Sequence, residues 1–506
     1  MPRELELKVE LSPGAIERLA GEVPAVDLSV GPASTQKLRT IYFDTPTLGL
    51  REAGISLRLR SHNGGWLQTV KADQHVTQGV SNPEELEVLL AADHPDVDKI
   101  ADKKLKRSVA KALKGTSLGP VFETVVERTT RQIRASGSEI ELAVDAGELR
   151  TQEARAELRE AELELKAGSA EGLLLAAEKL LAGQDLTLAT RSKAERGYRL
   201  VLEKTPTSPE PEKSCPVPLR GKDKSAEAFT AILASATRQI LVNRAALLET
   251  DDPDAAHQLR IGLRRLRSAL KALRGFDVSH SLTSFERAAR EVGSSVGVLR
   301  DADVLISAIY APIEATASDK RGFGDLYGTL TRYRRAKREE VRGRLRGPAW
   351  TRLQLYLTLW PRTLEENERL VRPIKKVARK VLRKAWKKSA KYGGDIDRLN
   401  GEQRHEMRKA LKTLRYQAEF FAPLFSTAKT EAFLRQLRVL QDVFGYINDV
   451  RMAAKLVEIG TQAAASGEVA RAASYILGRH EAEAEHVWRG ALPAWRALRR
   501  TSQFWS

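Results

Sequence analysis

The pentapeptide Glu-Leu-Glu-Leu-Lys occurs twice in the chain, at residues 4–8 and again at residues 162–166. Side chains of a β-strand alternate between its two faces, so each copy places two carboxylates and one ammonium on one face and two leucines on the other. One copy alone could be an amphipathic strand with a solvated face. Two copies can bring four carboxylates onto one surface, and these belong to Glu4, Glu6, Glu162 and Glu164.

Four carboxylates that converge on one cavity repel one another and lose their hydration. A divalent cation among them offsets both costs, and hard carboxylate oxygens suit Mg²⁺, Mn²⁺ or Ca²⁺. The two acidic segments therefore predict a metal site. Asp145, which precedes Ala146 and Gly147, is a further candidate ligand, with an Asp-x-Gly turn as the alternative.

Basic residues with the same alternation lie between the two acidic segments. Arg58 and Arg60 flank Leu59, and Lys71 follows a predicted hairpin turn at Gly64-Gly65. Cations that face a carboxylate-bound metal form a cage for a phosphate chain, because metal ions bridge phosphate oxygens and Arg or Lys neutralises the remainder. Further cations in strand-like segments are Arg39, Arg128, Arg131 and Lys193.

Several motifs, taken in order, resemble those of the CYTH domain, the triphosphate tunnel metalloenzyme family. They cover residues 1–204 and comprise the two acidic segments, Tyr42-Phe43-Asp44-Thr45, Leu57-Arg58-Leu59-Arg60, Lys71, Asp145-Ala146-Gly147, Ser192-Lys193 and Arg196-Gly197-Tyr198. The resemblance implies a closed eight-stranded antiparallel β-barrel with flanking helices, whose lumen binds a triphosphate. The family includes inorganic, thiamine and RNA triphosphatases as well as adenylate cyclases, and sequence pattern alone does not separate these activities.

The predicted mechanism is metal-dependent hydrolysis of a terminal phosphoanhydride of inorganic triphosphate. Mg²⁺ or Mn²⁺ would be held by Glu4, Glu6, Glu162 and Glu164, and the predicted catalytic residues are Glu4, Glu6 and Lys8. The triphosphate would be bound by Lys8, Arg39, Arg58, Arg60, Lys71, Arg128 and Lys193. Two alternatives stay open: a nucleotide enzyme of the adenylate cyclase or thiamine triphosphatase type, and a non-catalytic tunnel that only holds a polyphosphate chain.

Length, linker composition and charge divide the chain into two domains. A chain of 506 residues exceeds what one hydrophobic core normally serves. Five prolines between residues 206 and 218 indicate an extended linker. Residues 1–204 carry a net charge of −3, whereas the remainder carries +21. The sequence therefore predicts an N-terminal domain over 1–204, a linker over 205–220 and a strongly basic C-terminal domain over 221–506.

The C-terminal domain is predicted to be all α-helical and internally duplicated. Two sets of residues share their relative spacing 148 residues apart: His257, Arg260, Arg264 and Arg267 form a first stripe, and His405, Arg408, Lys412 and Arg415 form a second stripe. Each set falls on one face of a helix. Gly297 and Asp301 follow the first histidine at the same distances as Gly445 and Asp449 follow the second. This repetition predicts two pseudo-symmetric helical bundles, over about 221–355 and 370–506.

A basic stripe is usually a solvated helix face with i,i+4 salt bridges. Here acids are scarce at those spacings, with Glu402, Glu406 and Glu419 near the second stripe as the exceptions. The pattern resembles the CHAD domain, a helical domain named for its histidines, over residues 221–506. The resemblance implies that the residues of both stripes bind inorganic polyphosphate on a surface between the two bundles.

Two basic tracts, at residues 332–346 and 372–391, could bind any polyanion, including nucleic acid or an anionic membrane. Phe, Trp and Tyr make up only 6% of the residues, too few to argue for base stacking, and no zinc-finger spacing occurs. No apolar run in the sequence approaches the length of a membrane span. We therefore expect inorganic triphosphate and polyphosphate as partners, and neither specific nucleic-acid binding nor membrane binding.

The remaining sequence signals concern the cellular compartment and the other types of site that the sequence could contain. Cys215 is the only cysteine, which excludes disulfides and zinc–thiolate sites within one chain. The sequence begins with a charged strand rather than an apolar signal segment, and it contains neither a P-loop nor a dinucleotide-binding fingerprint. We expect a cytoplasmic inorganic triphosphatase fused to a polyphosphate-binding module, with polyphosphate granules as its expected place of action.

Overall fold

The computed structural model describes residues 5–21, 28–62, 64–72, 80–81, 84–181, 183, 186–189, 191–202, 209–276, 281–463 and 467–506. The chain forms two compact units. The first unit comprises Met1–Thr207 together with Trp350–Thr363, and the second unit comprises Ser208–Ala349 and Leu364–Ser506. The domain boundaries predicted at residues 204 and 221 stay a prediction, and the first unit additionally contains a segment from the helical half of the sequence.

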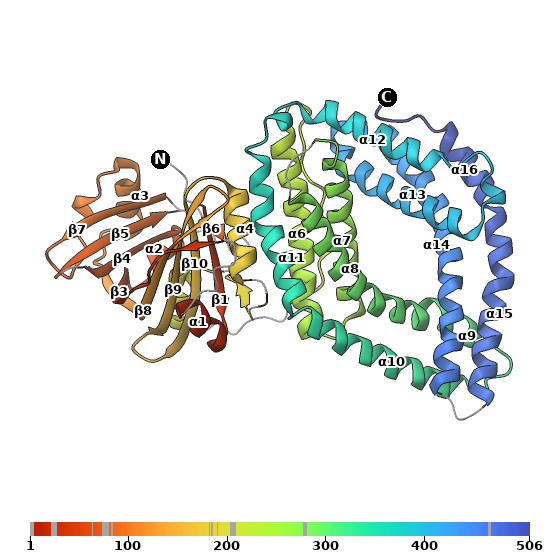
Figure 1. Cartoon of the computed structure of the whole chain (residues 1–506), viewed down its shortest axis with the longest axis horizontal. Coiled ribbons are helices and arrows are strands. Elements are labelled where there is room, and N and C mark those ends of the chain that lie inside the picture. The colour runs from red at the N-terminus through yellow and green to blue at the C-terminus, as the bar shows by residue number, and fades with distance from the viewer. Residues whose placement is uncertain are drawn as a thin grey trace. The chain divides into compact units, whose positions relative to one another are not determined.

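An antiparallel β-sheet forms the body of the first unit (Figure 1). The strands are β1 (Leu5–Leu11), β2 (Ser29–Val30), β3 (Ser34–Asp44), β4 (Ile55–His62), β5 (Gly65–Ala72), β6 (Val80–Ser81), β7 (Glu84–Leu90), β8 (Gly119–Ala135), β9 (Ser138–Arg150), β10 (Arg155–Ala167) and β11 (Leu186–Leu188). They pair in the order β11-β1-β10-β9-β8-β3-β4-β5-β7, with β2 beside β8 and β6 beside β1. The predicted hairpin before Lys71 is present, because β4 pairs with β5 from His62 opposite Gly65 onward.

The predicted closed eight-stranded barrel is wrong for the described residues. Nine strands lie along the pairing path, and β11 and β7 at its two ends do not pair with each other. The physical reason lies in β1, whose one edge pairs with β10 while its other edge is shared by two short strands, β11 and β6. Strand β7 forms the other end of the sheet. Among the described residues no long ladder joins β1 to β7, although β6, which pairs with β1, ends only two residues before β7 begins.

The two copies of the repeated pentapeptide lie on neighbouring strands. β1 and β10 are antiparallel, in a register that places Glu6 opposite Glu164 and Lys8 opposite Glu162. On the other face, Leu7 and Leu163 are completely buried. The alternation in the sequence thus separates an apolar face from a charged face on both strands at once.

Besides the short 3-10 turn η3 (Trp360–Leu364), six helices and one further 3-10 turn accompany the sheet in the described part of the first unit. They are α1 (Pro13–Ala20), α2 (Gly49–Glu52), η1 (Val97–Lys99), α3 (Lys103–Leu113), α4 (Ala170–Leu181), α5 (Lys193–Val201) and α11 (Pro348–Leu359). Helix α4 packs against β8, β9 and β10. Its apolar residues are buried almost without interruption, from Ala170 to Leu181.

Helix α11 lies far along the chain from the other elements of the first unit. The hydroxyl of Tyr356 donates a hydrogen bond of 2.8 Å to Oε2 of Glu178 on α4, and Arg352 Nε lies 3.2 Å from Oε1 of the same glutamate. Every residue from Trp350 to Trp360 is buried except Arg352, which is half-buried. Helix α11 is therefore enclosed on most sides, and its polar residues Thr351, Gln354 and Thr358 are buried together with its apolar ones.

A buried carboxylate fixes helix α5 to the end of β3. Asp44 accepts hydrogen bonds from the backbone N–H groups of Thr45, Leu50 and Arg51, which begin or precede α2. Its Oδ2 also accepts a bond of 2.8 Å from the hydroxyl of Tyr198 on α5. Burial, together with the Asp44 charge, raises the pKa of Tyr198. The phenol therefore stays a donor, and α5 is held in place.

The second unit is all α-helical, as the sequence predicts. Its helices are α6 (Ser225–Glu249), α7 (Pro253–Leu273), α8 (Leu282–Val304), η2 (Leu305–Tyr310), α9 (Ala311–Thr316), α10 (Phe323–Arg344), α12 (Ile374–Ala390), α13 (Gly401–Phe421), α14 (Thr427–Ala463), α15 (Gly467–Arg489) and α16 (Ala491–Arg500), with short 3-10 turns between some of them. Helices α7 and α13 each span 21 residues and begin 148 residues apart, which fits the predicted duplication. Within the described ranges, none of the helices combines the length and the apolar character needed to cross a bilayer.

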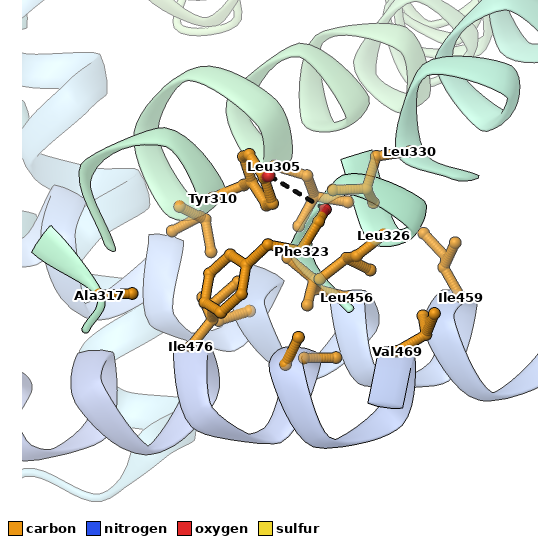
Figure 2. Packing of buried hydrophobic residues seen from close by; sticks show 14 residues of the cluster. Leu305, Tyr310, Ala317, Phe323, Leu326, Leu330, Leu456, Ile459, Val469 and Ile476 are labelled. Atoms are coloured by element: carbon orange, nitrogen blue, oxygen red, sulfur yellow. Dashed lines mark hydrogen bonds between the residues drawn. The ribbon is translucent and has the colours of Figure 1, made fainter. Parts of the chain in front are cut away.

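One apolar cluster of the second unit joins helices that are distant in sequence (Figure 2). It brings Leu305 and Tyr310 from η2 together with Phe323 and Leu326 from α10, and with buried residues of α14 and α15. The hydroxyl of Tyr310 donates a hydrogen bond of 3.0 Å to the carbonyl oxygen of Phe323, so the buried phenol is satisfied. The cluster fixes the turn after α8 against α14 and α15.

Candidate functional site

The first unit contains a polar cavity of about 610 Å³. It is lined from several strands and from the start of α5, by Glu6, Lys8, Tyr42, Ser56, Arg58, Arg60, Lys71, Glu87, Arg128, Glu141, Glu162, Glu164, Lys166, Ser192, Lys193 and Ala194. Only Tyr42 and Ala194 among these bring apolar surface. A cavity with so many cations and carboxylates suits a charged ligand rather than an apolar one.

Most of the sequence-predicted site residues come together in this cavity, but Arg39, Arg131 and Asp145 do not line it, and one residue cannot be placed. Arg39 pairs with Glu123 at 2.8 Å, and its side chain is 56% exposed. Its neighbours on β3 explain this, because Thr40 and Tyr42 are buried toward the cavity side and strand alternation turns Arg39 the other way. Arg131 donates instead to the backbone carbonyl of Ala20. Glu4 lies outside the described residues.

Glu162 forms ion pairs with three cations of the cavity. Lys8 Nζ lies 2.8 Å from its Oε1, Lys193 Nζ lies 2.9 Å from the same atom, and Arg128 Nη2 lies 2.9 Å from Oε2. Burial alone would raise the pKa of this carboxyl, but Lys193, Lys8 and Arg128 outweigh burial and hold it well below its usual range. Glu162 is therefore an anion at neutral pH.

Asp145 has a structural role that differs from the predicted turn. It lies within β9, is almost completely buried, and accepts two bonds of 2.7 Å from Nε and Nη2 of Arg128. Burial opposes ionisation, yet Lys193 and Arg128 lower the pKa of this carboxyl. Gly147 is required two residues later, because a Cβ there would lie 2.1 Å from the carbonyl oxygen of Val125. Asp145 thus orients Arg128 toward the cavity.

Glu6 belongs to a row of carboxylates that crosses three strands. Glu6 on β1 lies opposite Glu164 on β10, and Glu164 lies opposite Glu141 on β9. Burial and the charge of Glu162 raise the pKa of Glu6, although Lys8 partly offsets them at 3.0 Å. Lys166 lies 2.6 Å from Glu164 and 3.7 Å from Glu141. Directly opposed like charges on neighbouring strands are destabilising unless a cation lies between them.

The donor set of this row fits a divalent cation by its chemistry. Carboxylate oxygens are the preferred ligands of Mg²⁺ and Mn²⁺, and the raised pKa of Glu6 marks a position where further positive charge would be favourable. In the part of the chain that the structure describes, no three acidic, histidine or cysteine side chains are close enough together to form a complete metal site. Lys8 and Lys166 lie between the carboxylates in this arrangement.

The opposite side of the cavity is cationic. Arg58 and Arg60 on β4 and Lys71 on β5 line it, as the sequence predicts from their alternation. The charge of Arg58, together with burial, lowers the pKa of Arg60 to about 10. Two guanidinium groups that repel each other in a polar cavity gain from an anion between them.

Three acidic residues near the site escaped the sequence analysis. Glu141 and Glu87 line the cavity, and Glu160 lies beside it, almost completely buried and paired with Lys193. Burial outweighs the attraction of Lys193 and raises the pKa of Glu160. The signal for Glu160 was present, because the alternation of the second pentapeptide extends two residues toward the N-terminus. Glu141 and Glu87 also lie in alternating segments, Glu139-Ile140-Glu141-Leu142 and Glu85-Leu86-Glu87-Val88, so the same kind of signal was present for them.

The second unit brings the two basic stripes close to each other. Burial, then the charges of Arg264 and Arg408, lower the pKa of Lys412 to about 6. Arg264 of the first stripe therefore lies within electrostatic reach of the second. Arg260 donates to the carbonyl oxygen of Gly297 at 2.6 Å and to Asp301 at 3.1 Å, which explains the constant spacing between these residues in sequence. Burial, together with nearby cations, lowers the pKa of both stripe histidines, His257 and His405.

A cavity of about 330 Å³ lies along the first stripe. Arg260, Arg264 and Arg267 line it from α7, and residues of α8 line the other side. The acids near the stripes are few: Asp301 pairs with Arg260, and Glu419 lies 3.4 Å from Arg415. Of the eight stripe residues, His405 is exposed and the other seven are half-buried. The stripes thus present a net positive surface rather than a balanced set of salt bridges.

Comparison with known protein families identifies both halves. A CYTH domain matches residues 2–198, and a CHAD domain matches residues 231–458. The chain is therefore a CYTH–CHAD fusion.

Similarities to individual proteins were also found. An inorganic triphosphatase from Haemophilus influenzae is 28% identical over 204 residues, which are 40% of this chain and 55% of that protein. The chain thus spans about half the length of this curated relative. The crystal structure of the CHAD domain from the plant Ricinus communis matches with a TM-score of 0.52 at 28% identity, covering 58% of this chain and 99% of that one. A putative adenylyl cyclase from Hippeastrum, described with a dominant triphosphatase activity, covers 38% of this chain and 95% of its own at 20% identity, with a TM-score of 0.27.

Proposed function

We propose that the first unit hydrolyses inorganic triphosphate with the help of Mg²⁺ or Mn²⁺, and that the second unit binds inorganic polyphosphate. The observation that carries the first part is the cavity in which a row of carboxylates faces Arg58, Arg60 and Lys71. A phosphate chain needs cations along its length and a centre that offsets charge where a bond breaks. The similarity to an inorganic triphosphatase favours triphosphate among the possible substrates.

In this proposal Glu6, Glu162 and Glu164, with Glu4, hold the metal. A divalent cation held by these carboxylates would supply positive charge to the phosphates and would favour ionisation of a water molecule. The carboxylates supply only oxygen ligands, which is the donor type that these ions prefer. Lys8 and Lys166 would then release part of their contact with the carboxylates and turn toward the substrate.

The cations of the cavity position the chain of phosphates. Arg128 is held rigidly by two hydrogen bonds to Asp145, so its remaining donors have a fixed direction. Lys193 is at the first position of α5, and that helix is fixed by Tyr198 and Asp44. Together with Arg58, Arg60 and Lys71, these groups hold the substrate while the terminal phosphate is transferred to water.

For the second unit, the two stripes are the proposed polyphosphate-binding residues. The mutual crowding of Arg264, Arg408 and Lys412 supports this, because like charges at close range are stabilised by a polyanion. Binding of the polymer would hold the enzyme at polyphosphate granules in the cytoplasm.

The decisive experiment is a substrate panel on the full chain. Triphosphate, long-chain polyphosphate, ATP and thiamine triphosphate are each incubated with Mg²⁺ or Mn²⁺, and both phosphate release and cyclic AMP are measured. The proposal expects the highest kcat/KM for triphosphate and no cyclic AMP. Cyclic AMP formation would replace it with the cyclase alternative, and tight triphosphate binding without any phosphate release would leave a non-catalytic binding tunnel.

A further inference from the structure

We infer that the second unit contains a separate ligand site that binds a phosphorylated organic molecule of nucleotide size. This site, here called the α12 cavity, has a volume of about 500 Å³ and is formed by α7, α12 and α13 with Arg290 of α8. It meets the first stripe only at Arg267, so most of its residues belong to neither stripe. The inference does not depend on hydrolysis in the first unit.

Cations from two helices define one side of the α12 cavity. Lys380, Lys384 and Lys388 are spaced four residues apart on α12 and so lie along one face of that helix. Lys271 faces them from α7. Burial, then the charges of Arg267 and Lys388, lower the pKa of Lys271. These lysines are crowded by like charge, and an anion in the cavity would relieve that repulsion.

The acids around the α12 cavity are engaged by other cations. Glu406 is the one acid among the described lining residues, and it pairs with Lys409. Glu286, on α8, pairs with Arg274. Within the described ranges, Lys271 and the three α12 lysines have no ion pair. Among the described residues that line the cavity, cations therefore outnumber acids, and Lys271 and the three α12 lysines are not neutralised by an ion pair.

The α12 cavity also has an apolar floor, which distinguishes it from the cavity of the first unit. Phe276, Val381, Ala385 and Ala410 line it, and Lys380 Nζ lies 5.8 Å from the centre of the Phe276 ring. Residues 277–280, which follow this ring in sequence, lie outside the described part. A bare phosphate chain gains nothing from an apolar floor, whereas a ligand with a ring and phosphate groups uses both surfaces.

Photo-crosslinking of the full chain with 8-azido-ATP in EDTA tests the inference, because labelled peptides report the site directly. We expect label on the peptides that contain Phe276 and α12, in addition to any label in the first unit. Because the ring adds apolar contact, ATP should compete for this label at a concentration about tenfold lower than inorganic triphosphate does. Equal competition by the two compounds would overturn the inference, since it would mean that only phosphate is recognised.

A matched pair of variants completes the test. The double variant Lys384→Gln/Lys388→Gln removes two cations of the cavity and should lose the label on Phe276 and α12. The control Arg383→Gln/Lys387→Gln removes the same charge from exposed positions of the same helix that do not line the cavity, and it should keep the label. Label confined to the first unit, or equal loss in both variants, would overturn the inference.

Discussion

Lys8 Nζ and Glu162 Oε1, which are 2.8 Å apart, join the two copies of the repeated pentapeptide. The antiparallel register places the lysine that ends the first copy beside the glutamate that begins the second. Lys8 also reaches Glu6 at 3.0 Å, so one ammonium lies between two carboxylates. The repeated pentapeptide therefore brings carboxylates together and also supplies an ammonium group, that of Lys8, which partly neutralises them in the absence of a further cation.

The first prediction concerns Glu6. Glu6→Gln keeps the shape of the side chain but removes a charge from the proposed metal site, so kcat/KM for triphosphate should fall by about a hundredfold or more. Higher Mg²⁺ or Mn²⁺ should restore part of the activity. Glu127→Gln is the control, because Glu127 is exposed on β8 outside the cavity. Equal activity of the two variants would remove Glu6 from the mechanism.

The second prediction separates Arg128 from Arg39. Arg128→Lys loses the paired hydrogen bonds to Asp145, so KM for triphosphate should rise strongly. Arg39→Lys should leave kcat and KM close to normal, because the Arg39 side chain is 56% exposed and pairs with Glu123. Steady-state kinetics on both variants decides the matter. A large loss in Arg39→Lys would show that strand β3 presents its other face to the substrate.

The third prediction concerns the anchoring of α5. Tyr198→Phe removes one donor to Asp44, whose three backbone donors remain, so the free energy of unfolding of the first unit should fall by about 1–2 kcal/mol. KM for triphosphate should rise as well, since Lys193 begins the same helix. Urea unfolding and kinetics measure the two effects. Loss of stability with an unchanged KM would mean that Lys193 is positioned by other contacts.

The fourth prediction concerns the stripes. If both stripes bind one polymer, Arg264→Gln should weaken long-chain polyphosphate binding much more than triphosphate binding, because only a long chain contacts both. The affinity should also depend less steeply on salt, since fewer counterions are released. Binding titrations across chain lengths test this. Equal losses for short and long chains would show that the stripes act separately, and no loss would identify them as solvated helix faces.

The fifth prediction follows from Lys412, whose pKa in the folded chain is about 6. The unfolded chain binds the extra proton up to a pKa of about 10.4, so unfolding takes up a proton between these values. The free energy of unfolding should therefore rise from pH 6 to pH 9, and Lys412→Met should flatten this rise. Lys409→Met, at an exposed position of the same helix, is the control. A pH profile unchanged by Lys412→Met would contradict the low pKa.

The sequence predicted the charged face of the site because two strands repeat one alternation. The same reasoning failed for Arg39, because Leu38, Thr40 and Tyr42 are buried on one face of β3 whereas Arg39 is exposed on the other. The alternation separates two faces of a strand, but it does not reveal which of them turns toward the cavity. The row of Glu6, Glu164 and Glu141 depends on the register between β10 and β9, which no local pattern encodes.

Local sequence patterns likewise did not predict whether the barrel closes or which unit contains α11. Closure depends on which strand pairs with the second edge of β1, a contact between segments that are far apart in sequence. Helix α11 is buried along most of its length, including the polar residues Thr351, Gln354 and Thr358, but nothing in its sequence says which unit encloses it. The duplicated stripes, in contrast, were predictable, because their spacing repeats within single helices.

Membership of α11 in the first unit has a consequence for the order of synthesis. The ribosome completes the other strands and helices of that unit by residue 202, yet Tyr356 of α11 and its contact with Glu178 emerge about 150 residues later. Domains generally fold as units while the chain is made, N-terminal part first. The first unit is the earliest part of the chain to be synthesised, yet its folding cannot be completed at that stage. The surface of α4 that contacts α11 stays uncovered until more than two thirds of the chain has been translated.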